Sequence, residues 1–266
     1  MGITYRIVYR IVSLHSSEGK TTVGVLLVDE LRRLGVSVGV VKHSVHGVDV
    51  ADKDSAKYMA QGPSFVVVAS RDEVGLFKRG LGDDLEEVLK ALPLKPAVVI
   101  VEGYKRAKVG KVIAVVKDSD ELKELRKAVG GKLFAVVTLG ALDAGTVGDV
   151  KVFSLKNINE LARFVRDDAL NEILKALPKA DCSMCGLSSC LSMAHAILRG
   201  EALLSDCPVL SDVSVVIDGE PLPLKPFVKS VIKVLSTSLL SVLKGVPKDY
   251  REVVIRLRRD VKGREG

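Results

Sequence analysis

Four cysteines lie in one short stretch of this chain, and no cysteine precedes them. They are Cys182, Cys185, Cys190 and Cys207, in the spacing Cys-x2-Cys-x4-Cys-x16-Cys. Thiolates bind zinc and iron–sulfur clusters, and clustered cysteines in a reducing compartment indicate a metal rather than disulfides. We expect all four to hold one metal centre, with free structural thiols as the alternative.

The spacing bears on which metal the cysteines would hold. Zinc sites commonly use two Cys-x2-Cys pairs, and here only Cys182 and Cys185 form such a pair. Pro208 follows the last cysteine, as a proline does in many cluster proteins. The pattern therefore favours a [4Fe-4S] cluster over zinc. Residues 192–198 predict a helix beside the cluster, with His195 on its surface rather than among the ligands.

A second group of residues has the types that bind nucleotide phosphates. Residues 14–22 read Leu-His-Ser-Ser-Glu-Gly-Lys-Thr-Thr, which ends in the Gly-Lys-Thr of a Walker A loop. Loop amides and a helix N-terminus attract phosphate, Lys20 would reach the terminal phosphates, and the Thr21 hydroxyl would bind Mg²⁺. Leu14 occupies the position of the first glycine in the pattern. We predict a nucleotide-phosphate site with Mg²⁺.

Two further polar stretches follow predicted strands. Glu102 ends an apolar run in the manner of a Walker B element, where it could hold a water bound to Mg²⁺. Another set follows the second strand and could orient a phosphate, Mg²⁺ or an anionic substrate: Lys42, His43, His46 and Asp49. The two histidines lack a third ligand at a suitable spacing for a metal site. No Asn-Lys-x-Asp motif occurs, so the nucleotide base is left open.

The hydrophobic pattern predicts the elements that would position these residues. The predicted strands are 6–14, 36–41, 65–69, 97–101, 112–116 and 133–137, and the predicted helices are 20–34, 83–92, 119–129 and 157–177. Continuously apolar strands that alternate with helices are typical of an α/β fold, with a mostly parallel sheet covered by helices on both faces. The phosphate loop falls between the first strand and the first helix.

The rest of the chain predicts a small α+β tail. Its elements are a strand over 213–217, a turn at Asp218-Gly219, a short stretch over 221–224, a helix over 226–243 and a strand over 253–257. We place the domain boundary after Pro178. Residues 1–178 would form a P-loop nucleotide-binding domain, and residues 179–266 a four-cysteine [4Fe-4S] domain with its α+β tail.

Composition excludes several classes of protein. The chain has 266 residues and 47% hydrophobic content, which is enough for well-buried cores. The net charge of +7 is spread along the chain, which argues against nucleic-acid binding. Apolar runs such as 234–243 are about half the length that a membrane-spanning helix needs. The N-terminus lacks a signal-peptide or myristoylation pattern. We expect a cytoplasmic protein with no membrane partner.

Four motifs in order resemble the molybdopterin-guanine dinucleotide biosynthesis protein B family. They are Gly19-Lys20-Thr21-Thr22, Lys42-His43-x-x-His46 with Asp49, Lys53-Asp54-Ser55, and Val101-Glu102-Gly103-Tyr104-Lys105. The segment 182–208 is similar to the four-cysteine [4Fe-4S] domain of redox-complex and corrinoid-protein subunits. The stretch 219–245 resembles longer archaeal forms in which such a domain is fused to the family's P-loop domain. Leu14 and Ser17 replace glycines of the family.

The resemblance implies a GTP-binding, slowly hydrolysing P-loop protein that helps a nucleotidyltransferase attach GMP to a molybdenum or tungsten pterin cofactor. Asp49 would have a switch-like role nearby, and Glu102 would join Thr21 at Mg²⁺. The residues that would hold the phosphates of GTP are Ser16, Ser17, Glu18, Gly19, Lys20, Thr21 and Thr22. The implied partners are GTP, the nucleotidyltransferase and the pterin cofactor. Because members of the family are commonly dimers, we expect a homodimer.

Two other functions are compatible with these motifs. One is a nucleotide-regulated [4Fe-4S] electron-transfer protein, in which the cluster is the working part. The other is a small-molecule P-loop kinase, although no acceptor pocket or arginine lid is evident. The catalytic base is unknown; His15, His43, His46 and Asp49 are candidates that only geometry can decide between. A slow GTPase needs no dedicated base, so we expect at most that activity.

Overall fold

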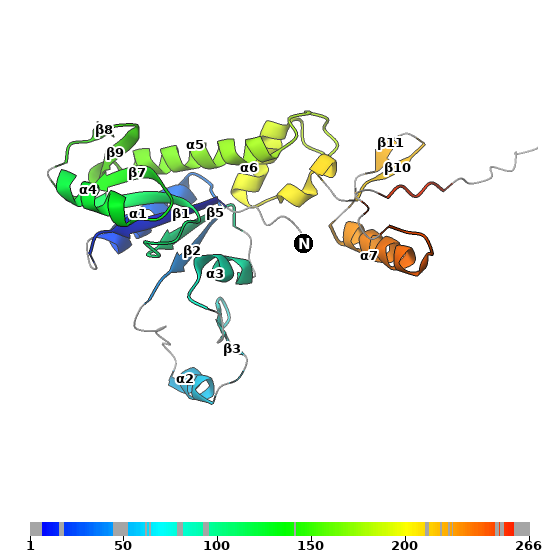
Figure 1. Cartoon of the computed structure of the whole chain (residues 1–266), viewed down its shortest axis with the longest axis horizontal. Coiled ribbons are helices and arrows are strands. Elements are labelled where there is room, and N and C mark those ends of the chain that lie inside the picture. Colours follow the sequence, from blue (N-terminus) through cyan, green and yellow to red (C-terminus); the bar gives the residue numbers. More distant parts are fainter. Residues whose placement is uncertain are drawn as a thin grey trace, which may run out of the picture. The chain divides into compact units, whose positions relative to one another are not determined.

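The computed structural model divides the chain into two compact units, Met1–Leu210 and Ser211–Gly266 (Figure 1). The structure describes residues 7–15, 19–44, 53–61, 63, 65–78, 82–92, 96–140, 142–210, 213–218, 220–222, 224, 226–247, 250 and 253–257. None of the helices within these ranges is long and apolar enough to cross a membrane.

The first unit is built on a seven-stranded sheet in the order β2-β5-β1-β6-β7-β9-β8. Neighbouring strands are parallel except β8 and β9, which run antiparallel. The sheet is therefore mostly parallel, as the sequence predicted. Its strands are β1 (Ile7–Ser13), β2 (Val38–Lys42), β5 (Val98–Glu102), β6 (Lys111–Val116), β7 (Lys132–Thr138), β8 (Gly145–Val147) and β9 (Val150–Ser154).

Helices cover both faces of this sheet (Figure 1). Helices α1 (Lys20–Arg33) and α5 (Ile158–Ala176) pack on one face, in a core with alternate residues of β1 such as Tyr9 and Ile11. Helices α3 (Leu85–Ala91) and α4 (Ser119–Ala128) pack on the opposite face, in clusters that include the intervening β1 residues. Burial on both faces explains why β1 and β5 are almost continuously apolar.

Local signals set the ends of these helices. Asp84 and Asp118 precede α3 and α4, and the carboxylate of each accepts hydrogen bonds from two backbone N–H groups of the first turn. Such caps are each worth about 1 kcal/mol. Helix α1 ends before Gly35, where the N–H of Val36 donates to the carbonyl of Leu31 at 3.0 Å. The predicted bounds of these three helices agree with the structure to within a few residues.

The predicted strand over 65–69 forms, but it lies outside the seven-stranded sheet. β3 (Phe65–Ala69) pairs with β4 (Val74–Lys78) in a separate antiparallel hairpin, so the prediction that 65–69 continues the parallel series was wrong. The N–H of Ser70 donates to the carbonyl of Glu73 at 2.8 Å, and this tight turn places β4 beside β3. A short apolar run does not by itself show which strand it pairs with. The sequence also gave no signal for α2 (Lys53–Ala60), β8 or β9.

The cysteine segment packs on the α/β part of the first unit. Helix α6 (Cys190–Arg199) buries Met193, Ala194 and Ile197 in the same core as α1 and α5. The N–H of Ser37 donates to the carbonyl of Leu198 at 2.8 Å. The predicted domain boundary after Pro178 thus lies inside the first compact unit, which extends to Leu210.

The described residues of the second unit form a hairpin and one long helix. β10 (Val215–Ile217) pairs antiparallel with β11 (Glu220–Leu222), and α7 spans Pro226–Val242, close to the predicted hairpin and helix. The predicted strand over 253–257 was wrong, because these residues have no regular secondary structure. Leu257 is 90% exposed, so the apolar residues of this run are not buried as those of a packed strand would be.

Candidate nucleotide site and cysteine centre

The phosphate loop runs from the end of β1 to the start of α1. Gly19 is the N-cap of α1 and has a φ of 74°, in the left-handed region that glycine tolerates best. A Cβ at this position would lie 2.6 Å from Cδ1 of Leu139, in the segment after β7. The backbone angle therefore favours glycine here, which supports the Gly-Lys-Thr interpretation.

Lys20 turns back toward the start of the loop. Its Nζ donates to Oγ of Ser13 at 2.7 Å and to the carbonyl oxygen of His15 at 2.9 Å. Ser13 is buried at the end of β1, next to the loop. These bonds place the ammonium group beside the loop, where a Walker A lysine is needed to contact phosphate.

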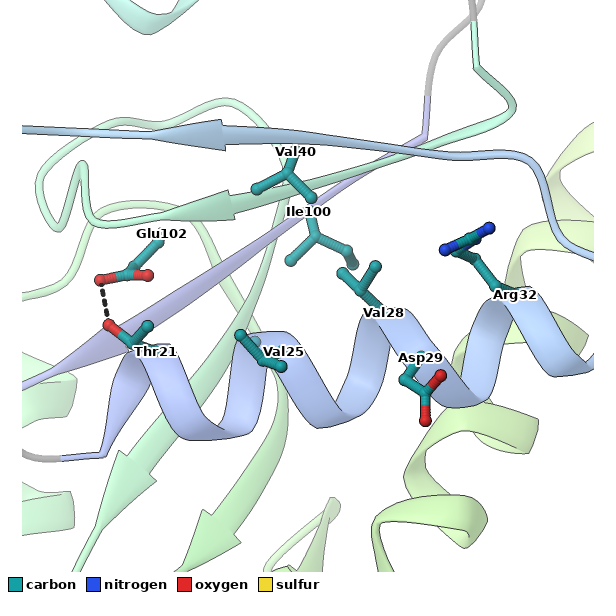
Figure 2. A pocket seen from close by; sticks show the side chains of 9 residues that line it. Thr21, Val25, Val28, Asp29, Arg32, Val40, Ile100 and Glu102 are labelled. Carbon is teal, nitrogen blue, oxygen red and sulfur yellow. Dashed lines mark hydrogen bonds between the residues drawn. The ribbon is translucent and has the colours of Figure 1, made fainter. Parts of the chain in front are cut away.

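Thr21 and Glu102 meet beside Lys20, at the carboxyl ends of neighbouring strands. Oγ1 of Thr21 donates to Oε1 of Glu102 at 2.8 Å, as Figure 2 shows. Glu102 ends β5, which lies between β1 and β2 in the sheet, and Nζ of Lys42 on β2 lies 4.0 Å from the same Oε1. A hydroxyl and a carboxylate are oxygen ligands of the kind that Mg²⁺ prefers. The donor set therefore fits the predicted magnesium site.

An aromatic and acidic cluster lies next to Glu102. The backbone N–H of His43 donates to the carbonyl of Glu102 at 3.0 Å. The His43 ring lies 4.6 Å from the ring of Tyr104, and its Nε2 lies 3.0 Å from Oδ2 of Asp83. Burial, together with the charge and hydrogen bonding of Asp83, raises the pKa of Tyr104 above its usual value.

Gly103 allows this close approach. Its φ of 99° is one that other residues rarely adopt, and a Cβ there would lie 2.9 Å from Cβ of His43. The N–H of Gly103 also donates to the carbonyl of Ile11 on β1 at 3.1 Å. Gly103 therefore ties the end of β5 to β1 and brings the following residues next to the phosphate loop.

The structure places some of the predicted site residues and not others. Gly19, Lys20, Thr21, Thr22 and Glu102 lie at the N-terminus of α1 and the adjoining end of β5. Five predicted residues of the nucleotide site lie outside the described ranges: Ser16, Ser17, Glu18, His46 and Asp49.

The sequence interpretation missed Ser13, Arg10 and the position of Lys105. Arg10 had a visible signal, because it is a charged residue within an otherwise apolar strand. Ser13 and Lys105 had none that composition or periodicity would reveal. The hydrogen bonds of Arg10 and Lys105 join segments more than 90 positions apart in the sequence, whereas Ser13 bonds to the nearby Lys20.

A pocket of about 290 Å³ adjoins Thr21 and Glu102, between α1 and the edge strand β2 (Figure 2). Its walls are mainly apolar, and Val25 and Val40 are 63% and 58% exposed. Two charged side chains of α1 also line it, farther along the helix (Figure 2). The lining residues are Thr21, Gly24, Val25, Val28, Asp29, Arg32, Val40, Ile100 and Glu102.

All four cysteines are free thiols, with different exposure to solvent. Cys190 and Cys207 are buried, Cys185 is half-buried and Cys182 is exposed. Cys185 packs against the core that contains Cys190 and Cys207. The N–H of Cys190 donates to Oδ1 of Asp181 at 2.7 Å, which fixes the start of α6. His195 is exposed on α6, as the sequence predicted.

The chemistry of these donors fits an iron–sulfur cluster. Four thiols in one segment, two of them shielded from water, match the ligand set of a [4Fe-4S] cluster and also that of a structural zinc site. Among the described residues, no three histidine, cysteine or acidic side chains are gathered as metal ligands. The thiols would therefore have to converge when a cluster binds.

Comparison with known proteins agrees with the arrangement at the phosphate loop. Residues 8–139 match the model of the family described as molybdopterin guanine dinucleotide synthesis protein B, MobB. This part of the chain belongs to the MobB family. The match spans β1 to β7 and so includes the loop, Thr21 and Glu102.

Individual relatives extend the likeness to the family. A Methanocaldococcus jannaschii protein named "Putative molybdopterin-guanine dinucleotide biosynthesis adapter protein" is 25% identical over 239 residues, covering 87% of this chain and 90% of that protein. The Escherichia coli molybdopterin-guanine dinucleotide biosynthesis adapter protein is 26% identical, covering 56% of this chain and 86% of that protein. A crystal structure of molybdopterin-guanine biosynthesis protein B (mobB) is 28% identical with a TM-score of 0.50, covering 61% of this chain and 99% of that one.

The cysteine segment has a separate match. Residues 177–209 match the model of a family described as "Putative Fe-S cluster". Helix α5 connects the segment to the MobB part, since it spans the second half of the stretch between the two matched regions. The chain thus joins a MobB domain to an iron–sulfur type domain.

Proposed function

We propose that this protein is a GTP-binding adapter in the biosynthesis of the molybdenum or tungsten pterin guanine dinucleotide cofactor, where it assists a nucleotidyltransferase. The observation that carries the proposal is the hydrogen bond between Thr21 and Glu102 beside Lys20, within a MobB domain. The names of the relatives from Methanocaldococcus jannaschii and Escherichia coli support the adapter role.

Different residues of the site would bind the phosphates and the Mg²⁺ of the nucleotide. Lys20 and the amides at the start of α1 would hold the phosphates, because both present positive charge to them. Thr21 and Glu102 would hold Mg²⁺ between the helix and the sheet. We assign no catalytic base; His43 contacts Asp83 and Tyr104. Positioning without a base agrees with a weak GTPase.

The nucleotide part of the proposal is tested by equilibrium titration with GTP, ATP and GMP, with Mg²⁺ or with EDTA. Lys20→Ala is expected to abolish binding, and Thr21→Val to remove only the part that depends on Mg²⁺. Lys123→Ala on the opposite face of the sheet is the matched control, since Lys123 is an exposed lysine of α4. Wild-type protein that binds no nucleotide, or binding unchanged by Lys20→Ala, would contradict the proposal.

The partner and the oligomeric state need their own tests. We propose a homodimer that contacts the nucleotidyltransferase, so sedimentation of the purified protein should give twice the chain mass of 28.6 kDa. Adding the nucleotidyltransferase should raise this mass further, and GTP should change the affinity of the complex. A protein that sediments as a monomer with and without GTP would rule out the homodimer. Separate sedimentation of this protein and the nucleotidyltransferase, with and without GTP, would rule out the complex.

We also propose that Cys182, Cys185, Cys190 and Cys207 bind a [4Fe-4S] cluster. When bound, such a cluster can accept and donate one electron. Anaerobic purification should yield iron and acid-labile sulfide in a ratio close to one, and Cys190→Ser should lower both. Zinc without sulfide would favour a structural zinc site instead.

A second function, a nucleotide-regulated electron-transfer protein, has one observation in its favour. The cysteine segment shares a core with α1, the helix that begins with Lys20: Met193 of α6 and Leu27 of α1 lie in the same cluster of buried residues. A reduction potential of the cluster that moves when GTP binds would support this function. A redox-silent cluster, or a potential insensitive to GTP, would exclude it.

A further inference from the structure

Arg10 is a buried charge in the centre of the sheet. It lies on β1 and is 0% exposed, and burial lowers its pKa from the usual value. Its guanidinium donates to backbone carbonyls rather than to a carboxylate. Nε donates to Val109 O at 2.7 Å, Nη1 to Tyr104 O at 2.7 Å and to Lys105 O at 3.3 Å, and Nη2 to Gly130 O.

These bonds hold the segment that follows Glu102. Tyr104 has a φ of 50°, an uncommon angle for a residue with a side chain, and its carbonyl accepts from Arg10. The N–H of Gly103 donates to Ile11 on the same strand. The loop between β5 and β6 is therefore attached to β1 at several points, and its side chains have defined positions relative to β1.

One of those side chains reaches the phosphate loop. Nζ of the half-buried Lys105 donates to the carbonyl oxygen of Leu14, the first residue after β1. The next carbonyl, of His15, accepts from Lys20. Two ammonium groups thus hold consecutive carbonyls at the start of the loop, and one of them belongs to a segment that Arg10 fixes in place.

We propose that Lys105, braced by Arg10, is a positioning residue that fixes the start of the phosphate loop at Leu14 and thereby sets the affinity for nucleotide phosphates. The affinity part rests on the proposed nucleotide binding, whereas the fixing of the loop does not. Leu14 stands where the Walker A pattern has glycine, so the loop begins differently from that pattern. The bond from Lys105 adds a restraint on the loop backbone at this position, from a segment outside the loop.

The affinity is tested with three variants of the full chain. Lys105→Met removes the donor and keeps most of the side-chain volume, and it is expected to weaken GTP binding about tenfold, as for the loss of one hydrogen bond from a charged donor. Lys105→Arg keeps a cationic donor and should recover most of the affinity. Lys108→Met is the control, because Lys108 is an exposed lysine of the same loop, and it should bind GTP as the wild type does.

The fixing of the loop is tested without nucleotide, by hydrogen exchange of peptides that span residues 13–24. Lys105→Met should speed their exchange, while Lys108→Met should not, and the thermal midpoint of both should stay near that of the wild type. Unchanged exchange in Lys105→Met overturns the proposal, whatever the titration shows. Faster exchange with unchanged GTP affinity overturns its affinity part. If the wild type binds no nucleotide, the proposed function fails and the exchange result alone decides the role of Lys105.

Discussion

Replacing Arg10 by Met should strongly destabilise the first unit. Arg10 donates short hydrogen bonds to three backbone carbonyls, those of Val109, Tyr104 and Gly130. Hydrogen bonds from a charged donor contribute about 1.5–3 kcal/mol each, so their sum is about 5–9 kcal/mol. Removing a buried charge also relieves a desolvation cost of several kcal/mol. We expect a net loss of about 3 kcal/mol, which is a large part of the stability of an ordinary domain.

The assay is urea unfolding followed by tyrosine fluorescence, supported by the thermal midpoint. For a unit of this size, 3 kcal/mol corresponds to a fall of roughly 6–12 °C. Arg163→Met on α5 is the matched control, since Arg163 is exposed and its loss should cost less than about 0.5 kcal/mol. A loss under 1 kcal/mol for Arg10→Met would refute the reasoning, because it would mean that water or other donors satisfy these carbonyls at little cost.

Two further predictions follow from the loop after Glu102. Gly103→Ala should lower the free energy of unfolding in urea by about 1–3 kcal/mol, because of the strained φ and the close neighbour. Gly148→Ala is the control and should cost less, since the φ of Gly148 is also positive but nothing lies within 4 Å of its Cβ position. Equal losses in the two variants would contradict a role for the close contact at Gly103. Because the pKa of Tyr104 is raised in the folded state, its phenolate absorbance should appear at a higher pH than that of tyrosine in the urea-unfolded protein. Its stabilising effect should be complete below the pKa of an unfolded tyrosine and be lost as the pH rises through the folded pKa. Tyr104→Phe should remove one step above the usual tyrosine pKa from the absorbance titration of the folded protein, and a titration curve that is unchanged there would contradict the prediction.

Features that depend on neighbouring residues were predictable from the sequence. The order strand, phosphate loop and helix follows from a β-branched run, a Gly-Lys-Thr stretch and helical spacing up to Gly35, all within about thirty residues. The helix-capping acids Asp84 and Asp118 act within one turn. The spacing of the four cysteines is likewise a local pattern, and it agrees with the matched iron–sulfur type domain.

Predictions failed where a segment's partner lies elsewhere in the chain. The apolar run 65–69 looks like a buried strand, yet a turn pairs it with β4 outside the main sheet. The run 253–257 also has a strand-like composition, but no described strand pairs with it.

The sequence by itself determined the residue types of the candidate site and the local elements that carry them, because capping, turns and periodicity act between near neighbours. Only the tertiary structure decided which of these residues meet. Thr21 and Glu102 are 81 positions apart, and Lys105 and Leu14 are 91 apart. They come together because parallel strands place their carboxyl ends at one edge of the sheet, and because the buried Arg10 fixes the loop that follows β5.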